Sequence, residues 1–328
     1  MIEVYHEPVC RRYYAARLSC AYVFFLCVVA CLAILPFFLA YESSAAFWLK
    51  TNTYREQPKV IFEHKVLGLL HGRDSNDNPL QIVYTSMAAL AHLFEANLRS
   101  PVLRSIEIDK NRDAIPDRLH LSVLVPLQRG ETILASSFVA FFNVKLRNRA
   151  RLEMETIAYS GANSPLPGSA LFVDGDYTLR QRWPLRAKGG YQLPYDNTPL
   201  LDPTSLDLAA NQAVFPRLLA AYRQRNNTMN FDGRYEVWTP VLAPVDNDFG
   251  HQTFNLTVNL HVKTADVLYT PTASEVLKVA WIQYLAIFVV VAYLLDQLCA
   301  FVFYNQLVDT EMTVETLQNK RGEKVKFL

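Results

Sequence analysis

LSCAYVFFLCVVACLAILPFFLAY, residues 18–41, is an apolar run near the start of the chain that contains no charged side chain. A second uncharged run, residues 279–295, lies near the other end and holds one amide, Gln283. A helix of about 20 apolar residues crosses the hydrocarbon core of a bilayer. The two runs therefore predict a membrane protein with two spans. The long, more polar sequence between them predicts one large domain on one side of the membrane.

The second run reaches the length of a span when its helix covers residues 276–304, which places Lys278 and Asp296 near the two interfaces. The first run could instead belong to a cleaved signal peptide, with Ser44-Ala45-Ala46 as the cleavage site. The apolar core of a signal peptide is usually about 7–15 residues long. The greater length of residues 18–41 favours a retained span.

Basic residues flank both spans on the sides away from the large domain. Residues 1–17 carry three arginines, and residues 305–328 carry four lysines and arginines after the acidic start of that tail. Because Lys and Arg next to a span favour the cytoplasmic side, both termini are predicted to be cytoplasmic. Residues 42–275 are then predicted to be extracellular or lumenal. Two glycosylation sequons in this region, at Asn226 and Asn255, agree with that side.

Charge and cysteine content narrow the class further. The net charge of +1, from 32 basic and 31 acidic residues, gives no indication of nucleic-acid binding. The five cysteines all lie in or beside the spans, so the large domain is expected to depend on a hydrophobic core rather than on disulfides. Cys10, Cys20 and Cys299 lie near the predicted cytoplasmic face, where they are either palmitoylation sites or small apolar residues of the helices.

Short runs with β-type composition dominate the sequence between the spans. Apolar and polar residues alternate over residues 118–125 and 253–262, as in strands with one buried face. Asp174-Gly175-Asp176 predicts a hairpin turn, and residues 216–225 predict a helix. We therefore expect a mainly β, β-sandwich-like domain between two transmembrane helices. Further strands are predicted over residues 59–67, 133–146, 152–159 and 170–179, a second helix over 86–98, and loops over 160–169 and 183–204.

An acidic motif precedes the first of the two alternating strands. Its oxygen-bearing side chains, Asp109, Asn111 and Asp113, occupy every second position, and Asp117 follows. This spacing resembles calcium loops, in which such oxygens converge on one cation. Ala114 stands where the sharp turn of those loops has glycine, and a residue with a side chain resists the positive φ of that turn. The motif is therefore either a calcium site or a solvated turn before a strand.

Three sequence motifs of enzymes do not occur in this chain: His-Glu-x-x-His, Gly-x-Ser-x-Gly and a phosphate-binding glycine loop. A lumenal enzyme acting on glycans or lipids would need converging carboxylates, for which the candidates are Asp174 and Asp176 beside Glu153 or Glu155. A receptor is a further alternative, but its cytoplasmic segments are too short for a signalling domain. The uncharged cores of the spans hold no ionisable group of the kind that marks a transport path.

Several blocks of sequence carry a family resemblance. Phe47–Lys50 and Tyr54–Val60 lie just outside the first span. Further blocks follow in order: the acidic loop running into Leu119-His120-Leu121, then Pro126-Leu127-Gln128, Pro167-Gly168-Ser169, Ala220–Asn226, Lys278–Tyr284 and Phe301–Gln306. With these blocks in this order, the chain resembles the transmembrane protein 231 family of the ciliary transition zone. Ala114 departs from the glycine expected in that family, and residues 183–214 match it poorly.

The resemblance implies a non-enzymatic scaffold component of the membrane complex at the ciliary transition zone, with no cofactor. It implies tectonic, B9-domain and Meckel-syndrome-type membrane proteins as partners. It further implies a role in the diffusion barrier that controls the protein composition of the ciliary membrane, in cilium formation and in Hedgehog signalling. The candidate contact residues, which are equally candidates for interfacial anchors, are aromatic side chains beside the spans: Phe47, Trp48, Tyr54, Trp281 and Tyr284.

Overall fold

The computed structural model describes residues 9–17, 19–43, 47–91, 94, 97–187, 190–201, 214–241 and 252–316. The chain divides into two compact units. Both ends of the chain, residues 1–50 and 273–328, contribute to a helical unit, and residues 51–272 form a β-domain. The predicted fold class, a mainly β domain between two apolar helices, is confirmed.

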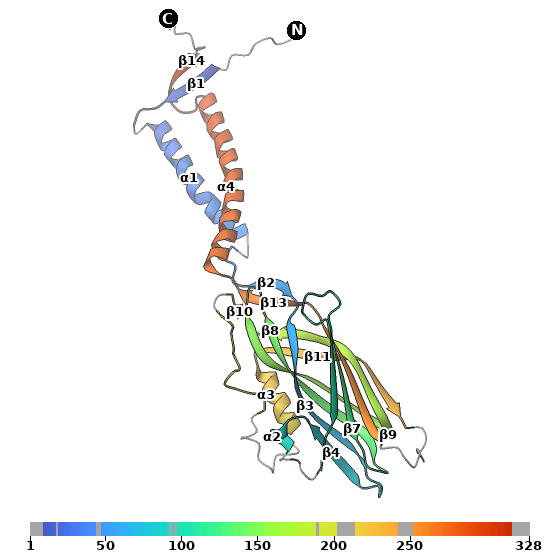
Figure 1. Cartoon of the computed structure of the whole chain (residues 1–328). Coiled ribbons are helices and arrows are strands. Elements are labelled where there is room, and N and C mark those ends of the chain that lie inside the picture. The colour runs from blue at the N-terminus through green and yellow to red at the C-terminus, as the bar shows by residue number, and fades with distance from the viewer. Residues whose placement is uncertain are drawn as a thin grey trace, which may run out of the picture. The chain divides into compact units, whose positions relative to one another are not determined.

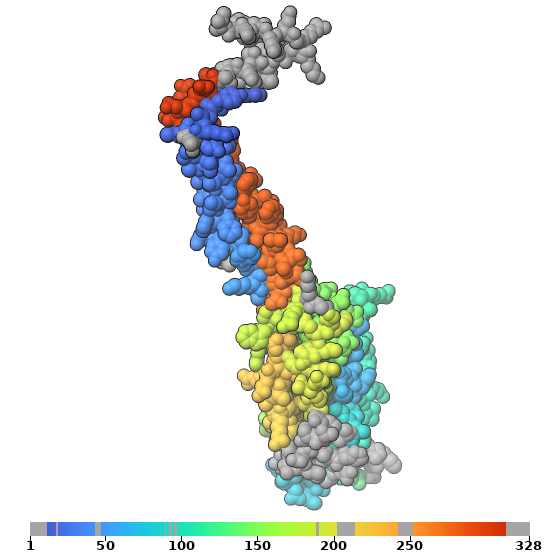
Figure 2. Space-filling model, turned by 90° about the vertical axis from the view of Figure 1, so that its left-hand side faces the viewer, coloured from blue at the N-terminus to red at the C-terminus, as the bar shows by residue number. Residues whose placement is uncertain are grey.

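Two long apolar helices make up most of the helical unit. α1 is Cys20–Ser43 and α4 is Ala273–Tyr304, and Figure 2 shows them side by side in blue and orange. Small side chains allow this approach, because Ala21, Ala40 and Ala280 are all buried. Most of the larger apolar side chains face outward, as they do in helices surrounded by lipid. The length and composition of the helices fit a two-span membrane protein.

The two ends of the chain pair with each other in the helical unit. β1, Val9–Tyr14, and β14, Glu311–Thr316, form an antiparallel two-stranded sheet. The ring of Tyr13 on β1 stacks on that of Phe303 on α4, with their centroids 5.9 Å apart. The flanks of the two helices therefore lie on the same side of the helix pair. The basic flanks predicted a common side for the two termini, but the pairing of β1 with β14 has no signal in the sequence.

The strands of the β-domain are β2 (Asn52–Glu56), β3 (Lys59–Arg73), β4 (Pro79–Thr85), β5 (Leu98–Arg99), β6 (Val102–Ile108), β7 (Arg118–Pro126), β8 (Thr132–Leu146), β9 (Leu152–Gln181), β10 (Leu185–Arg186), β11 (Asn227–Pro240), β12 (Thr253–Val262) and β13 (Ala265–Thr270). Nine of them form one sheet with the order β5-β4-β3-β8-β9-β12-β7-β6, and β11 pairs with β9 as well (Figure 1). A smaller sheet has the order β10-β13-β2.

β9 runs without a break for 30 residues and belongs to both halves of the large sheet. Its first half pairs with β8 as far as Gly168, and its second half lies between antiparallel β11 and parallel β12. Buried side chains from both halves form one core, in which the ring centroid of Phe142 on β8 lies 5.4 Å from that of Tyr177 on β9. The curled sheet thus packs its two halves face to face, which gives the sandwich-like arrangement.

β8 is buried on both faces, which explains its continuous apolar run. Phe142 belongs to the core between the two halves, whereas its neighbour Phe141 belongs to a second buried cluster. Two helices contribute to that second cluster, α2 (Ala88–Ala91) and α3 (Val214–Gln224), the latter through Leu218. α2 and α3 therefore cover the outer face of the first half of the sheet.

Two sequence-based predictions about β9 are wrong, the loop over residues 160–169 and the hairpin at Asp174-Gly175-Asp176, because the strand passes through both. The glycine serves a close approach of backbones instead. A Cβ atom at Gly175 would lie 2.3 Å from the carbonyl oxygen of Asp232 on β11. The Asp-Gly signal therefore marks tight strand pairing rather than a turn. Of the helix predicted over residues 86–98, the structure shows only α2, Ala88–Ala91, among the described residues, and Leu98 belongs to β5.

Candidate functional site

Aromatic side chains gather where the described chain resumes after α1. Phe47 is 5% exposed, and its ring centroid lies 5.7 Å from that of Phe37 and 6.2 Å from that of Tyr41, both on α1. Phe47 also belongs to a buried cluster with Ala280 of α4, so it packs against both helices. The ring centroid of Trp48 lies 5.3 Å from that of Phe47, but Trp48 is 52% exposed. Phe47 is therefore a packing residue, whereas Trp48 presents its ring to the surroundings.

A second aromatic group lies in the early turns of α4. Trp281 stacks on Tyr284 with ring centroids 5.8 Å apart, and Tyr284 stacks on Phe288 at 5.9 Å. Trp281 is exposed. Stacked amphipathic rings near the end of a span suit the boundary between hydrocarbon and headgroups. Their roles as interfacial anchors or as contacts with another protein stay predictions.

The side chain of Tyr54, the remaining aromatic candidate, packs within the β-domain. Its ring packs edge-on against Tyr269 of β13, with centroids 5.4 Å apart. Its hydroxyl donates to the carbonyl oxygen of Ala150 (3.3 Å) and accepts from the N–H of the same residue (3.2 Å). Burial raises the pKa of Tyr54 to about 12. The side chain therefore joins β2 to β13 and to the turn between β8 and β9.

The acidic motif forms a loop between β6 and β7 that its own carboxylates close. Asp109 accepts hydrogen bonds from the backbone N–H groups of Arg112 (2.6 Å) and Ala114 (2.9 Å). Asp117 accepts a hydrogen bond from the backbone N–H of Lys110 (2.8 Å). Side chains that bond to nearby backbone in this way stabilise a turn without any ligand.

The other oxygens of the motif are also engaged within the loop or with its neighbour. Asn111 donates to Asp113 (2.9 Å), and Asp113 accepts from the N–H of Ile115 (2.8 Å). Gln57 donates to Asp117 (3.1 Å), which lowers the pKa of that carboxyl group. Within the described residues, no group of three or more Asp, Glu, His or Cys side chains is arranged to hold a metal ion. Calcium binding by this loop stays a prediction.

Ala114 has a φ of +64°, a conformation that glycine adopts without steric cost. We expect Ala114→Gly to stabilise the β-domain by about 0.5–1 kcal/mol, because relief of left-handed strain outweighs the entropy that glycine loses on folding. The melting temperature of the full chain in detergent micelles measures the change. Ala221→Gly on α3 is the matched control, and it should destabilise by about 0.5–1 kcal/mol because its backbone is helical. A lower melting temperature for Ala114→Gly would contradict the prediction.

The four carboxylates considered for a lumenal enzyme do not converge. Glu153 and Glu155 lie in the first half of β9, whereas Asp174 and Asp176 lie in the second half, which pairs with different strands. Glu153 forms an ion pair with Lys145 at 2.7 Å. Asp176 pairs with a lysine and an arginine at 2.7 and 2.9 Å. These carboxylates therefore belong to separate surface ion pairs rather than to one acid–base site.

The two sequon asparagines have different surroundings. Asn226 lies in the turn between α3 and β11, where its Oδ1 accepts a hydrogen bond from the N–H of Trp183 (2.8 Å). Asn255 lies in β12, which is paired on both edges, and its buried Oδ1 has no hydrogen-bond partner among the described residues. A bulky glycan needs room around its attachment point, so the turn position of Asn226 suits it better. The use of either sequon stays a prediction.

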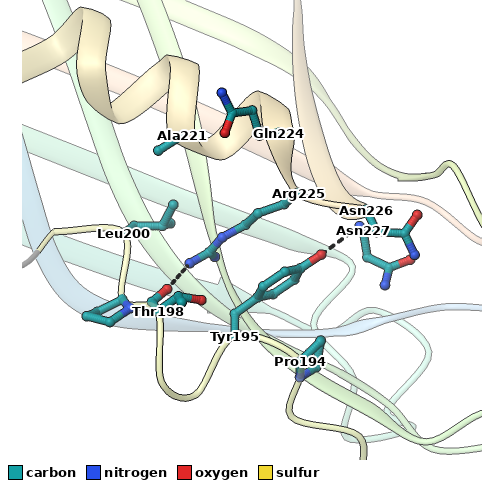
Figure 3. Close-up of a pocket in the computed structure, with 10 residues that line it drawn as sticks. Pro194, Tyr195, Thr198, Leu200, Ala221, Gln224, Arg225, Asn226 and Asn227 are labelled. Atoms are coloured by element: carbon teal, nitrogen blue, oxygen red, sulfur yellow. Dashed lines mark hydrogen bonds between the residues drawn. The ribbon is translucent and has the colours of Figure 1, made fainter.

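A pocket of about 380 Å³ lies between α3 and residues 194–200 (Figure 3). The guanidinium of Arg225, just after α3, lies 4.3 Å from the centroid of the Tyr195 ring. It donates to the carbonyl oxygens of Glu155 (2.8 Å) and Thr198 (2.6 Å). Burial lowers the pKa of Arg225. Arg225 therefore fastens residues 194–200 to the sheet, a role that no motif around it signals.

Comparison with known proteins matches residues 1–312 to the family model described as transmembrane protein 231. The chain belongs to the transmembrane protein 231 family. Transmembrane protein 231 of Homo sapiens is 32% identical over 94% of this chain and 94% of its own length. The proteins of that name from Mus musculus and Xenopus tropicalis are 30% identical over 94% of this chain, and 94% and 95% of their own lengths. The resemblance read from the sequence blocks is thus confirmed.

The transmembrane protein 231 match includes both apolar helices and the whole β-domain, since it ends within β14. A solved structure described as "Cryo-EM structure of a proton-activated chloride channel" covers 86% of this chain and 97% of that chain, with a TM-score of 0.29 and 6% identity. A superposition this loose carries no argument about fold or function. Membership of the transmembrane protein 231 family rests on the sequence matches.

Proposed function

We propose that this chain is a non-enzymatic scaffold component of the membrane complex at the ciliary transition zone. The observation that carries the proposal is the match to the transmembrane protein 231 family over residues 1–312. The proposed neighbours are tectonic, B9-domain and Meckel-syndrome-type membrane proteins. By holding its β-domain among them, the chain would contribute to the diffusion barrier of the ciliary membrane, to cilium formation and to Hedgehog signalling.

Features of the described residues support a scaffold rather than a catalyst or a transporter. The carboxylates that sequence alone offered for catalysis are separated along β9 and engaged in ion pairs. The uncharged cores of the two spans contain no Asp, Glu, Lys, Arg or His, whereas transport paths usually need such a side chain. Trp48 and Trp281 expose large rings beside the helices, where a neighbouring membrane protein would be met.

The proposed orientation places both termini in the cytoplasm and the β-domain outside or in a lumen. The pairing of β1 with β14 supports a common side of the membrane for the two flanks. The arginines of residues 1–17 and the basic residues of the tail favour the cytoplasm for that side. The sequons at Asn226 and Asn255 would then lie in the compartment where glycosylation takes place.

Imaging of the tagged full chain in ciliated cells tests the function. We expect a narrow band at the base of the cilium, between the basal body and the ciliary membrane, because a scaffold of the transition zone is retained by its neighbours. Fluorescence recovery after bleaching within the band should be slow for the same reason. A diffuse signal in the endoplasmic reticulum or the plasma membrane, without a band, would overturn the proposal.

A matched control separates targeting by the β-domain from targeting by the helices. In this control, residues 51–272 are replaced by an unrelated soluble domain, and both helices and the β1–β14 pair are retained. We expect this chimera to lose the band. A chimera that still forms the band would assign retention to the helical unit instead.

A further inference from the structure

The chain enters and leaves the β-domain at the same end, which we call the entry end. The chain enters at Thr51 and leaves at Thr272, and the adjoining strands β2 and β13 pair with each other. Figure 1 shows β2 and β13 lying across one end of the long strands. Only two residues separate the end of β13 from the start of α4, a length of chain that spans about 10 Å at most. This entry end is therefore tethered closely to an apolar helix.

Arginines concentrate in the turn between β8 and β9 at this entry end. The turn reads Arg147-Asn148-Arg149-Ala150-Arg151, and the three arginines are exposed. The carboxylate of Glu56, at the end of β2, fixes the turn by accepting hydrogen bonds from the N–H groups of Arg147 (2.7 Å) and Asn148 (3.2 Å). Arg149 donates to the hydroxyl of Tyr269 on β13 (2.7 Å). The turn is thus held beside both strands that connect to the helices.

A hollow of about 380 Å³ opens beside this turn. Four cationic side chains line it, together with the amides Gln57 and Asn148: Arg55, Lys59, Lys145 and Arg147. Arg55 pairs with Asp266 at 2.9 Å, and Lys145 pairs with Glu153 at 2.7 Å. The two acidic residues of the lining, Glu56 and Asp113, are engaged by backbone N–H groups.

Two of the four cations form no ion pair with a described carboxylate. Among the described residues, no carboxylate lies within ion-pair distance of Lys59 or Arg147, and the same is true of Arg151 and Arg186 nearby on the same end. Arg186 lies opposite Thr270, the last residue of β13. The entry end therefore presents open positive charge directly beside the chain's connection to α4.

We propose that the entry end of the β-domain binds the phosphate groups of phospholipid headgroups in the membrane that its own helices span. Lys59 and Arg147 in the hollow, together with Arg151, supply the charge and the hydrogen-bond donors. The planar fork of an arginine matches two phosphate oxygens. The short tether to α4 keeps these groups at a high effective concentration near headgroups, which favours lipid phosphate over free phosphate.

A spin label reports directly on this contact. The full chain, with its five cysteines replaced by alanine, carries Asn148→Cys in the arginine turn and is reconstituted in phosphatidylcholine nanodiscs. Asn76→Cys is the matched control, because Asn76 lies in the exposed turn between β3 and β4, at the opposite end of β3. We expect the label at position 148 to be at least threefold less accessible to a water-soluble nickel chelate than the label at position 76. Equal accessibility would overturn the proposal.

Charge reversal separates phosphate binding from mere proximity to the membrane. Lys59→Glu/Arg147→Glu/Arg151→Glu should bring the accessibility at position 148 to that of the control, whereas Arg104→Glu on β6 should leave it unchanged. Melting temperatures within the error of the parent show that the variants are folded. A triple variant that folds and keeps the label shielded would overturn the proposal, and a triple variant that fails to fold is replaced by Arg147→Gln/Arg151→Gln, judged by the same criterion.

Two further measurements distinguish lipid phosphate from free phosphate. In dodecyl maltoside micelles, which have no phosphate, we expect the label at position 148 to become as accessible as the control. Adding inorganic phosphate to the micelles should not restore the shielding. If inorganic phosphate restores it, the hollow is a site for free phosphate and the assignment to lipid is wrong. None of these outcomes depends on where in the cell the chain resides, so they are separate from the test of the ciliary function.

Discussion

Gly68→Ala is expected to destabilise the β-domain by about 3 kcal/mol or more. Gly68 on β3 lies directly opposite Tyr84 on β4, and a Cβ atom at position 68 would lie 1.8 Å from Cζ of that ring. The ring cannot move aside easily, because Tyr84 is fully buried in the core between the two halves of the sheet. The melting temperature of the full chain in micelles and the yield of folded protein measure the loss.

Two comparisons make this prediction specific to the contact between the glycine and the ring. Apart from its chain neighbours, no described residue has an atom within 4 Å of a Cβ added at Gly190, so Gly190→Ala should change the stability by less than about 0.5 kcal/mol. Gly68→Ala combined with Tyr84→Ala should be more stable than the sum of the two single losses, because the second change removes the clash. Additive losses in the double variant, or a Gly68→Ala melt like that of Gly190→Ala, would refute the close-packing argument.

Arg225→Ala should destabilise the β-domain by about 2–4 kcal/mol. The substitution leaves the carbonyl oxygens of Glu155 and Thr198 without their charge-assisted hydrogen bonds. It also removes the stack on Tyr195 and opens the wall of the pocket. Arg225→Lys should recover only part of this, because an ammonium group is compact and cannot reproduce the two-armed geometry. Thermal melts of the full chain in micelles give the order of the three proteins.

A local measurement distinguishes loss of this fastening from a general loss of stability. Because Arg225 fastens residues 194–200 to the sheet, Arg225→Ala should speed proteolytic cleavage in that segment well below the melting temperature. The side chain of Arg223 is exposed, so Arg223→Ala should leave both the melt and the cleavage unchanged. Cleavage in residues 194–200 at the same rate in both variants would show that Arg225 does not hold the segment.

Strands with one buried face were predictable because burial of one face produces an alternation of apolar and polar residues. Residues 253–262 form β12 and residues 118–125 lie in β7, each with the alternating buried and half-buried pattern expected from the sequence. The course of β9 was not predictable in this way. Pro165, Pro167 and Gly168 indicate a loop locally, but partners far along the chain, β8 and β11, keep this segment extended. Long-range pairing overrode the local signal there.

The sequence likewise indicated the role of some residues of the candidate site but not of others. Trp48 and Trp281 were found because exposed aromatic residues next to a span have a sequence signature. Tyr54 has the same signature, yet its hydroxyl bonds to Ala150 across the domain. Arg225 was missed because its partners are backbone carbonyl oxygens, which leave no trace in the sequence. Sequence therefore indicates which side chains are unusual for their position, but not whether their partners come from within the chain.

The course of β9 has a consequence for how the chain is made. The strand is complete at Gln181, but the two strands that flank its second half, β11 and β12, end at Pro240 and Val262. A ribosome adding about 5–20 residues per second delivers them several seconds later. During that interval the second half of β9 has two unpaired edges, which can pair with the wrong strands. Biogenesis, rather than the finished fold, is then the stage at which substitutions in the second half of β9 do most damage.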